Sequence, residues 1–168
     1  MIIVIMGPSG CGKSTVGNAL SSRINWPFIE GDDYHSESNR IKLSVGIPLS
    51  DEDRLPWLQC LRNLSLQHDN TILACSALKT SYRNILSGSN YGDNRTTLFV
   101  LLSANKGLLQ KRISDRKGHF MNPSLLQSQL ETLEPFEDYE NYAVIDASDS
   151  IAEITQQIIN AIGSKTFF

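Results

Sequence analysis

The feature that most constrains the fold of this chain is a glycine-rich segment between an apolar run and a helix-like segment. Residues 7–14 read Gly-Pro-Ser-Gly-Cys-Gly-Lys-Ser and match the pattern G-x-x-x-x-G-K-[ST]. Residues 2–6 are continuously apolar, and residues 15–23 have the character of a helix. A strand, a glycine-rich turn and a helix in this order gather backbone N–H groups around an anion. The sequence therefore predicts a phosphate-binding loop, and not a glycine-rich turn of another kind.

The residue types in this loop suit a nucleoside triphosphate. Glycine lets the backbone adopt positive φ and approach the phosphates closely. We expect Lys13 to reach the β- and γ-phosphates and the Ser14 hydroxyl to bind Mg²⁺. The chain lacks the N-K-x-D pattern that specifies guanine, which favours ATP over GTP. The expected nucleotide contacts in the loop are Gly7, Pro8, Ser9, Gly10, Cys11, Gly12, Lys13, Ser14 and Thr15.

Composition limits the other possibilities. The 168 residues are 40% hydrophobic and 20% charged, which predicts a single globular domain spanning residues 1–168. A net charge of −3 provides no general field for nucleic acid or anionic lipid, so neither is expected as a partner. The three cysteines are widely spaced, as in proteins with reduced thiols. No segment has the length of a membrane span or a signal peptide, so we expect a cytoplasmic protein.

Short apolar runs alternate with helical patterns along the chain, which predicts an α/β fold with an open, parallel sheet. The expected strands are 2–6, 27–30, 71–75, 97–102 and 142–146. The expected helices are 15–23, 53–67, 77–87, 106–116, 123–133 and a last one around 151–162. In such sheets ligands bind at the carboxyl ends of the strands, so residues that follow the strands are the candidates for chemistry.

Two polar segments follow expected strands. Residues 31–35 read Gly-Asp-Asp-Tyr-His, and adjacent carboxylates at a strand end can hold Mg²⁺ or take a proton from a hydroxyl. Aspartates that only cap a helix or line a loop explain the same pattern equally well. After the third strand, Lys79 and Arg83 share one helix face, where two cations could clamp an anion. Solvated surface charges give the same pattern and are the commoner explanation.

The densest basic cluster of the chain lies at residues 111–119. Arg112 and Arg116 are four residues apart, and Gly118 is followed by His119. Phosphoryl transfer spreads negative charge over the moving group, so a mobile, arginine-bearing lid is physically expected. We predict such a lid over the nucleotide at about residues 111–125, carrying Arg112 and Arg116. A basic solvent-exposed face is the alternative.

Several longer segments, in this order, resemble the small gluconokinases. The resemblance runs from the phosphate loop to about residue 136. The loop itself is shared by a very large superfamily, whereas the blocks D-D-x-H, P-L-x-D-x-D-R-x-P-W and C-S-A-L-K are much more specific. The segments that carry the resemblance are 31–35 (GDDYH), 39–43 (NRIKL), 46–58 (GIPLSDEDRLPWL), 75–79 (CSALK), 118–121 (GHFM) and 125–135 (LLQSQLETLEP).

This resemblance implies phosphorylation of D-gluconate at its 6-hydroxyl by ATP and Mg²⁺, giving 6-phosphogluconate and ADP. It also implies a five-stranded sheet in the order 2-3-1-4-5 with a mobile lid, and a homodimer as one possible assembly. Lys13, Asp33 and Arg116 take the catalytic positions, and Ser14 and Asp33 the metal positions. The implied substrate contacts are Asp33, His35, Lys42, Arg54, Lys79, Arg83, His119 and Gln129.

Two other functions stay open on the sequence. The first is a kinase of the same architecture that acts on another small polyhydroxy acid, such as shikimate or a different aldonate. The second is a regulatory protein in which the ATP site drives a conformational switch. A carboxylate beside the phosphates and arginines in a lid favour transfer over switching, because a switch needs no group that activates an acceptor.

Overall fold

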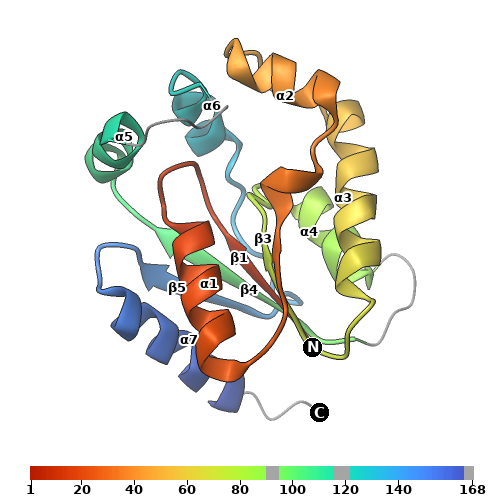
Figure 1. Cartoon of the computed structure of the whole chain (residues 1–168), viewed down its shortest axis with the longest axis vertical. Coiled ribbons are helices and arrows are strands. Elements are labelled where there is room, and N and C mark those ends of the chain that lie inside the picture. Colours follow the sequence, from red (N-terminus) through yellow and green to blue (C-terminus); the bar gives the residue numbers. More distant parts are fainter. Residues whose placement is uncertain (90–94, 116–121, 165–168) are drawn as a thin grey trace.

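The computed structural model describes residues 1–89, 95–115 and 122–164, and its centre is a parallel five-stranded sheet (Figure 1). The order across the sheet is β2-β3-β1-β4-β5, as expected. Each strand lies within one residue of its expected bounds at either end. The strands are β1 (Ile2–Met6), β2 (Phe28–Glu30), β3 (Thr71–Ala74), β4 (Thr97–Ser103) and β5 (Tyr142–Asp146).

The side chains of β1 divide the core into two layers. Every residue of this central strand is buried, which explains its continuous apolar run. Ile3 and Ile5 belong to a cluster with residues of α1 (Lys13–Ile24) and α7 (Ile151–Ser164). The alternate residues of the strand pack with α3 (Asp51–Ser65) and α4 (Thr80–Ser87) on the other face. The period-two alternation of a strand therefore fixes which helices cover which face.

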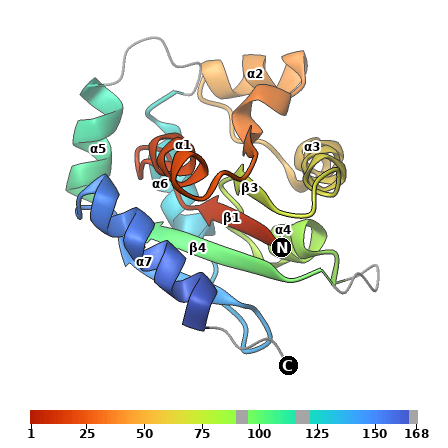
Figure 2. The ribbon, with the colours of Figure 1, turned by 60° about the horizontal axis from the view of Figure 1, so that its bottom comes forward.

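The remaining helical elements gather at the carboxyl end of the sheet, around the phosphate loop. They are η1 (Gly31–Tyr34), a 3₁₀ turn, and the helices α2 (Glu37–Ser44), α5 (Lys106–Asp115) and α6 (Leu125–Thr132). Figure 2 shows α1 between α5 and α2, so the helix that follows the phosphate loop has one of them on each side. The stretch between β2 and β3 supplies η1, α2 and α3 without interruption.

Three of the differences between the expected and the observed helices have a clear physical cause. α2 was not expected, because its polar sequence ESNRIKLS buries only Asn39 and Leu43 and has no apolar stripe. α3 begins two residues earlier than expected, at Asp51, because Ser50 and Asp53 form a capping box. α4 begins three residues later, at Thr80, because Ala77 adopts a left-handed conformation with φ of 46° that no helix allows.

The region expected to form a lid is described only in part. Residues 111–115 end α5, residues 116–121 lie outside the described part of the chain, and the chain resumes beside α2. There the Asn122 N–H donates to the Leu43 carbonyl at 3.0 Å. Movement of residues 111–125 therefore stays a prediction. Among the described residues, no helix combines the length and the apolar character needed to cross a membrane.

Candidate active site

The loop between β1 and α1 has the backbone conformation that an anion site requires. Gly7, Gly10 and Gly12 have φ of 134°, 84° and 103°, values that residues with a Cβ resist. A Cβ on Gly10 would also lie 2.9 Å from the Leu109 carbonyl oxygen. Gly12 caps α1 without a side-chain hydrogen bond, so the first N–H groups of the helix face the cavity without a competing cap.

Lys13 reaches back over this loop. Its Nζ donates to the carbonyl oxygens of Gly7 at 3.0 Å and Pro8 at 3.2 Å. The ammonium therefore lies at the mouth of the loop, where the N–H groups also converge. Ser14, in the first turn of α1, lines the same cavity. This arrangement concentrates positive charge and donors at one point.

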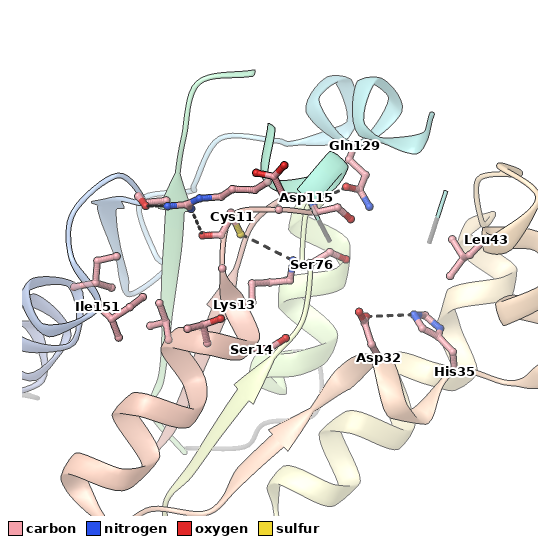
Figure 3. A pocket seen from close by; sticks show the side chains of 18 of the residues that line it. Cys11, Lys13, Ser14, Asp32, His35, Leu43, Ser76, Asp115, Gln129 and Ile151 are labelled. Atoms are coloured by element: carbon pink, nitrogen blue, oxygen red, sulfur yellow. Dashed lines mark hydrogen bonds and ion pairs between the residues drawn. The ribbon is translucent and has the colours of Figure 1, made fainter. Parts of the chain in front are cut away.

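A cavity of about 520 Å³ opens above the loop and has two halves. One half lies toward α5 and α7, where Arg112, Ala147 and Ile151 line it. The other half lies toward η1, α2 and α3 (Figure 3). The residues that line this second half are Asp32, His35, Leu43, Arg54, Trp57, Ser76 and Gln129. The size and division of the cavity suit two ligands placed end to end.

Among the described residues, Asp32 and Asp115 are the carboxylates that line the cavity, and Asp33 is not one of them, which corrects its expected position. A 3₁₀ turn has three residues per turn, so positions 32 and 35 lie on one side of η1 and position 33 on another. Asp32 and His35 both line the cavity, with 4.0 Å between Asp32 Oδ1 and His35 Nε2 (Figure 3). Asp33 is exposed and does not line it. The sequence shows two adjacent carboxylates, and only the turn geometry separates them.

His35 is held as a neutral imidazole. Its ring is 8% exposed and stacks on Trp57 with 4.1 Å between centroids. Burial is the main cause that lowers the pKa of His35 to about 4; Asp32 opposes the shift, and the charges of Arg54 and Arg40 contribute to it. At neutral pH this side chain therefore offers one N–H donor and one acceptor nitrogen, which suits a hydroxyl group.

Arg54 supplies the positive charge in this half of the cavity. Its Nε is buried and has no hydrogen-bond partner among the described residues. The guanidinium lies over the Tyr82 ring, 5.5 Å from the centroid, and the Tyr82 hydroxyl donates to Asp51. An arginine held by an aromatic face, with a donor left over, is suited to receive a carboxylate.

Lys42 and Lys79 form ion pairs and do not line the cavity. Lys42 Nζ lies 2.7 Å from Asp53 Oδ1, and Lys79 Nζ lies 2.8 Å from Asp51 Oδ1. Hydrogen bonds from Lys79 and Tyr82 lower the pKa of Asp51. These pairs join α2 and the N-cap residue of α4 to the N-terminal turn of α3, next to Arg54. Direct contact of either lysine with substrate remains a prediction.

Arg83 does not reach the cavity, which corrects its expected position. Its side chain is 0% exposed, and Nε donates to Glu140 Oε1 at 2.6 Å. Its Nη2 donates to the Pro135 carbonyl oxygen at 2.7 Å, and the guanidinium lies over the Phe136 ring. Lys79 and Arg83 are four residues apart in sequence, but α4 begins only after Lys79. The two cations therefore do not share a helix face, and they pair with different carboxylates, Asp51 and Glu140. Arg83 fastens the 134–140 segment to α4.

Gln129 and Arg112 connect the surrounding helices to the phosphate loop. The Ser9 N–H donates to Gln129 Oε1 at 2.8 Å, so α6 holds the tip of the loop. Arg112 donates to the carbonyl oxygens of Cys11 at 3.3 Å and Ala147 at 2.8 Å. Both residues line the cavity, and their contacts with substrate and nucleotide stay predictions. Arg116 and His119 lie outside the described residues.

The sequence singled out the adjacent pair Asp32 and Asp33, but the catalytic role was assigned to Asp33, and the role of Trp57 was not predicted. Trp57 lines the cavity, stacks on the His35 ring and donates from Nε1 to the Gly31 carbonyl at 2.8 Å. The signal for Asp32 was its i, i+3 spacing to His35, which has meaning only once a 3₁₀ turn is recognised.

Comparison with known proteins identifies the family. The shikimate kinase family profile matches residues 9–163. A probable gluconokinase of Mus musculus is 43% identical over 178 residues, covering 96% of this chain and 97% of the relative. The thermosensitive gluconokinase of Escherichia coli K12 is 39% identical over 165 residues, covering 95% and 86%. The crystal structure of a gluconokinase from Sinorhizobium meliloti 1021 has a TM-score of 0.83 and 42% identity, covering 96% and 90%. With likeness of this extent in sequence and in fold, the chain belongs to the gluconokinase family, within the wider group of kinases that the shikimate kinase profile describes.

Proposed function

We propose that this protein transfers the γ-phosphoryl group of ATP to the 6-hydroxyl of D-gluconate, giving 6-phosphogluconate and ADP. The observation that carries the proposal is the shared cavity, in which Asp32, His35 and Arg54 lie on one side of the phosphate loop. A carboxylate, a neutral imidazole and a guanidinium match the hydroxyls and the carboxylate of an aldonate. The relatives named as gluconokinases support the same substrate.

On the nucleotide side, the proposed work is charge neutralisation and alignment. The N–H groups of the loop and Lys13 bind the β- and γ-phosphates, and Arg112 adds a cation beside them. Ser14 and Asp32 offer oxygen atoms of the kind that Mg²⁺ prefers, and the metal would neutralise charge on the phosphates. The adenine is expected along Ala147 and Ile151, at the far end of the cavity.

On the acceptor side, each end of gluconate meets a different group. Asp32 orients the 6-hydroxyl and receives its proton as the oxygen attacks phosphorus. His35 and Gln129 hydrogen-bond hydroxyls along the chain. Arg54 binds the carboxylate with its planar fork. Most of the rate then comes from alignment and charge stabilisation, because phosphoryl transfer needs little covalent work from the protein.

The lid remains part of the proposal. Closure of residues 111–125 would bring Arg116 and His119 toward the transferred group and exclude water, which suppresses hydrolysis of ATP. Location in the cytoplasm and assembly as a homodimer are likewise proposals, drawn from the resemblance and the composition. Sedimentation of the purified protein tests the assembly directly.

A coupled ADP-release assay with Mg²⁺-ATP tests the function. The acceptors are D-gluconate, other aldonates, shikimate and a blank without acceptor, and the product is identified by mass and by its oxidation with 6-phosphogluconate dehydrogenase. We expect turnover with D-gluconate and 6-phosphogluconate as product. Turnover with another acceptor alone would overturn the substrate, and ATP binding without acceptor-dependent turnover would favour the regulatory alternative.

A further inference from the structure

The turn that carries Asp32 and His35 is held through its backbone carbonyl groups. A short 3₁₀ turn satisfies few of its own carbonyls, so other groups must bind them. Trp57 Nε1 of α3 binds the carbonyl of Gly31 at 2.8 Å. A Cβ on Gly31 would lie 2.3 Å from the Ala74 carbonyl oxygen, so the first residue of the turn is also confined against β3. These contacts fix the start of the turn only.

Arg40 fixes the rest of it. One guanidinium nitrogen, Nη2, donates to the carbonyl oxygens of Asp32 at 3.2 Å and Asp33 at 3.0 Å, and Nε donates to that of His35 at 3.4 Å. A single planar side chain thus bridges three carbonyls at the C-terminal end of η1. A cation at the end of a helical turn is also favoured by the partial negative charge of those carbonyls.

Arg40 is itself carried on an anchored support. It lies on α2, whose Asn39 donates to the Asp53 carbonyl at 2.9 Å and whose Lys42 pairs with the Asp53 carboxylate. Both contacts join α2 to the capped N-terminus of α3. The position of the guanidinium is therefore set by the same helix that carries Arg54 and Trp57.

We propose that Arg40 is a positioning residue for phosphoryl transfer, which holds the turn so that the Asp32 carboxylate and the His35 imidazole face the acceptor hydroxyls. This inference rests on the proposed function, and it adds a residue that touches neither substrate nor nucleotide. Displacement of a catalytic group by about 1 Å can cost a factor of about 10² in rate. Loss of the three hydrogen bonds should therefore lower kcat without weakening ATP binding.

The test compares Arg40→Met and Arg40→Lys with a matched control, Arg95→Met. Arg95 also donates to a backbone carbonyl, that of His68 at 2.6 Å, which lies outside the 31–35 turn, and neither arginine lines the cavity. We expect Arg40→Met to lower kcat at least about tenfold, with the KM for ATP within about twofold of the parent. The kcat of Arg40→Lys should lie between those of Arg40→Met and the parent, because an ammonium group keeps the positive charge but cannot bridge three carbonyls as a guanidinium does. Added guanidinium ion, at concentrations below those that unfold the protein, should restore part of the activity of Arg40→Met. The control Arg95→Met should keep the parent's kcat and should not be activated by guanidinium.

Hydrogen exchange supplies a readout that does not depend on turnover. In the Arg40→Met protein, the peptide covering residues 29–36 should exchange faster than in the parent, while peptides from α1 and β1 stay unchanged. A kcat for Arg40→Met within twofold of the parent, or a loss that only follows the unfolded fraction, would overturn the inference. An inactive parent with D-gluconate would instead contradict the proposed function, and the exchange result would still decide whether Arg40 holds the turn.

Discussion

At the scale of single residues, two neighbouring aspartates have different surroundings although the sequence presents them as equivalent. Asp32 lines the cavity beside His35, and Asp33 points to solvent. The phosphate loop could be predicted by residue type and spacing, whereas Arg54 and Gln129 were named only through the resemblance to the small gluconokinases. The choice between Asp32 and Asp33 could not be predicted, because it depends on the three-residue period of a 3₁₀ turn, and no pattern of side chains in the sequence indicates that turn.

A pair of substitutions separates these two carboxylates. Asp32→Asn should lower kcat by a factor of about 10²–10⁴, the usual contribution of a general base, while the affinity for ATP changes little. Asp33→Asn serves as the matched control and should keep kcat within about twofold of the parent. Steady-state kinetics with D-gluconate checks both. If the two variants exchanged these results, the assignment from the structure would be wrong.

The buried His35 also predicts how stability depends on pH. Its pKa is about 4 in the folded protein and 6.5 in the reference state, so the unfolded chain binds the proton more readily. Stability should therefore fall as pH decreases from about 6.5 to about 4, by up to about 3 kcal/mol. Urea unfolding at several pH values measures this, and His35→Gln should flatten the dependence. His68→Gln, which changes an exposed histidine, should leave it unaltered.

At the scale of elements, a buried ion pair joins α4 to the segment 134–140. Arg83 and Glu140 are both buried, with side chains 0% and 3% exposed. Arg83→Met would leave the Glu140 carboxylate without its partner, so we expect a loss of about 3–5 kcal/mol in the free energy of unfolding. The double variant Arg83→Met/Glu140→Gln should recover much of it. An effect of Arg83→Met on the KM for gluconate alone, with stability unchanged, would restore the role first expected from sequence.

The elements also show where sequence patterns fail physically. The continuous apolar strands were predicted closely because burial on both faces leaves a plain signature. α2 was missed because polar contacts to α3 and the carbonyl contacts of Arg40 hold it in place instead of an apolar face. Helix ends shifted where Ser50 caps α3 and where Ala77 interrupts the approach to α4.

At the scale of the whole molecule, nucleotide binding should stabilise the fold through the loop at the centre of the sheet. A ligand at 100 times its Kd contributes about 2.7 kcal/mol, which for a domain of this size raises Tm by about 5–10 °C. Thermal unfolding with and without Mg²⁺-ATP measures this shift. Lys13→Ala should remove most of the shift and abolish transfer, because the charge on the phosphates is lost. A full shift in that variant would place the phosphates elsewhere.

The arrangement of the cavity has a consequence for how acceptor selectivity can change in evolution or by design. Most of the acceptor side comes from the uninterrupted stretch between β2 and β3, with Asp32, His35, Leu43, Arg54 and Trp57 all inside residues 31–57. The nucleotide side is built from the two flanking parts of the chain. One recombination event, or one cassette exchanged by an engineer, can therefore replace the selectivity of the enzyme for its acceptor while the phosphate donor machinery is passed on intact.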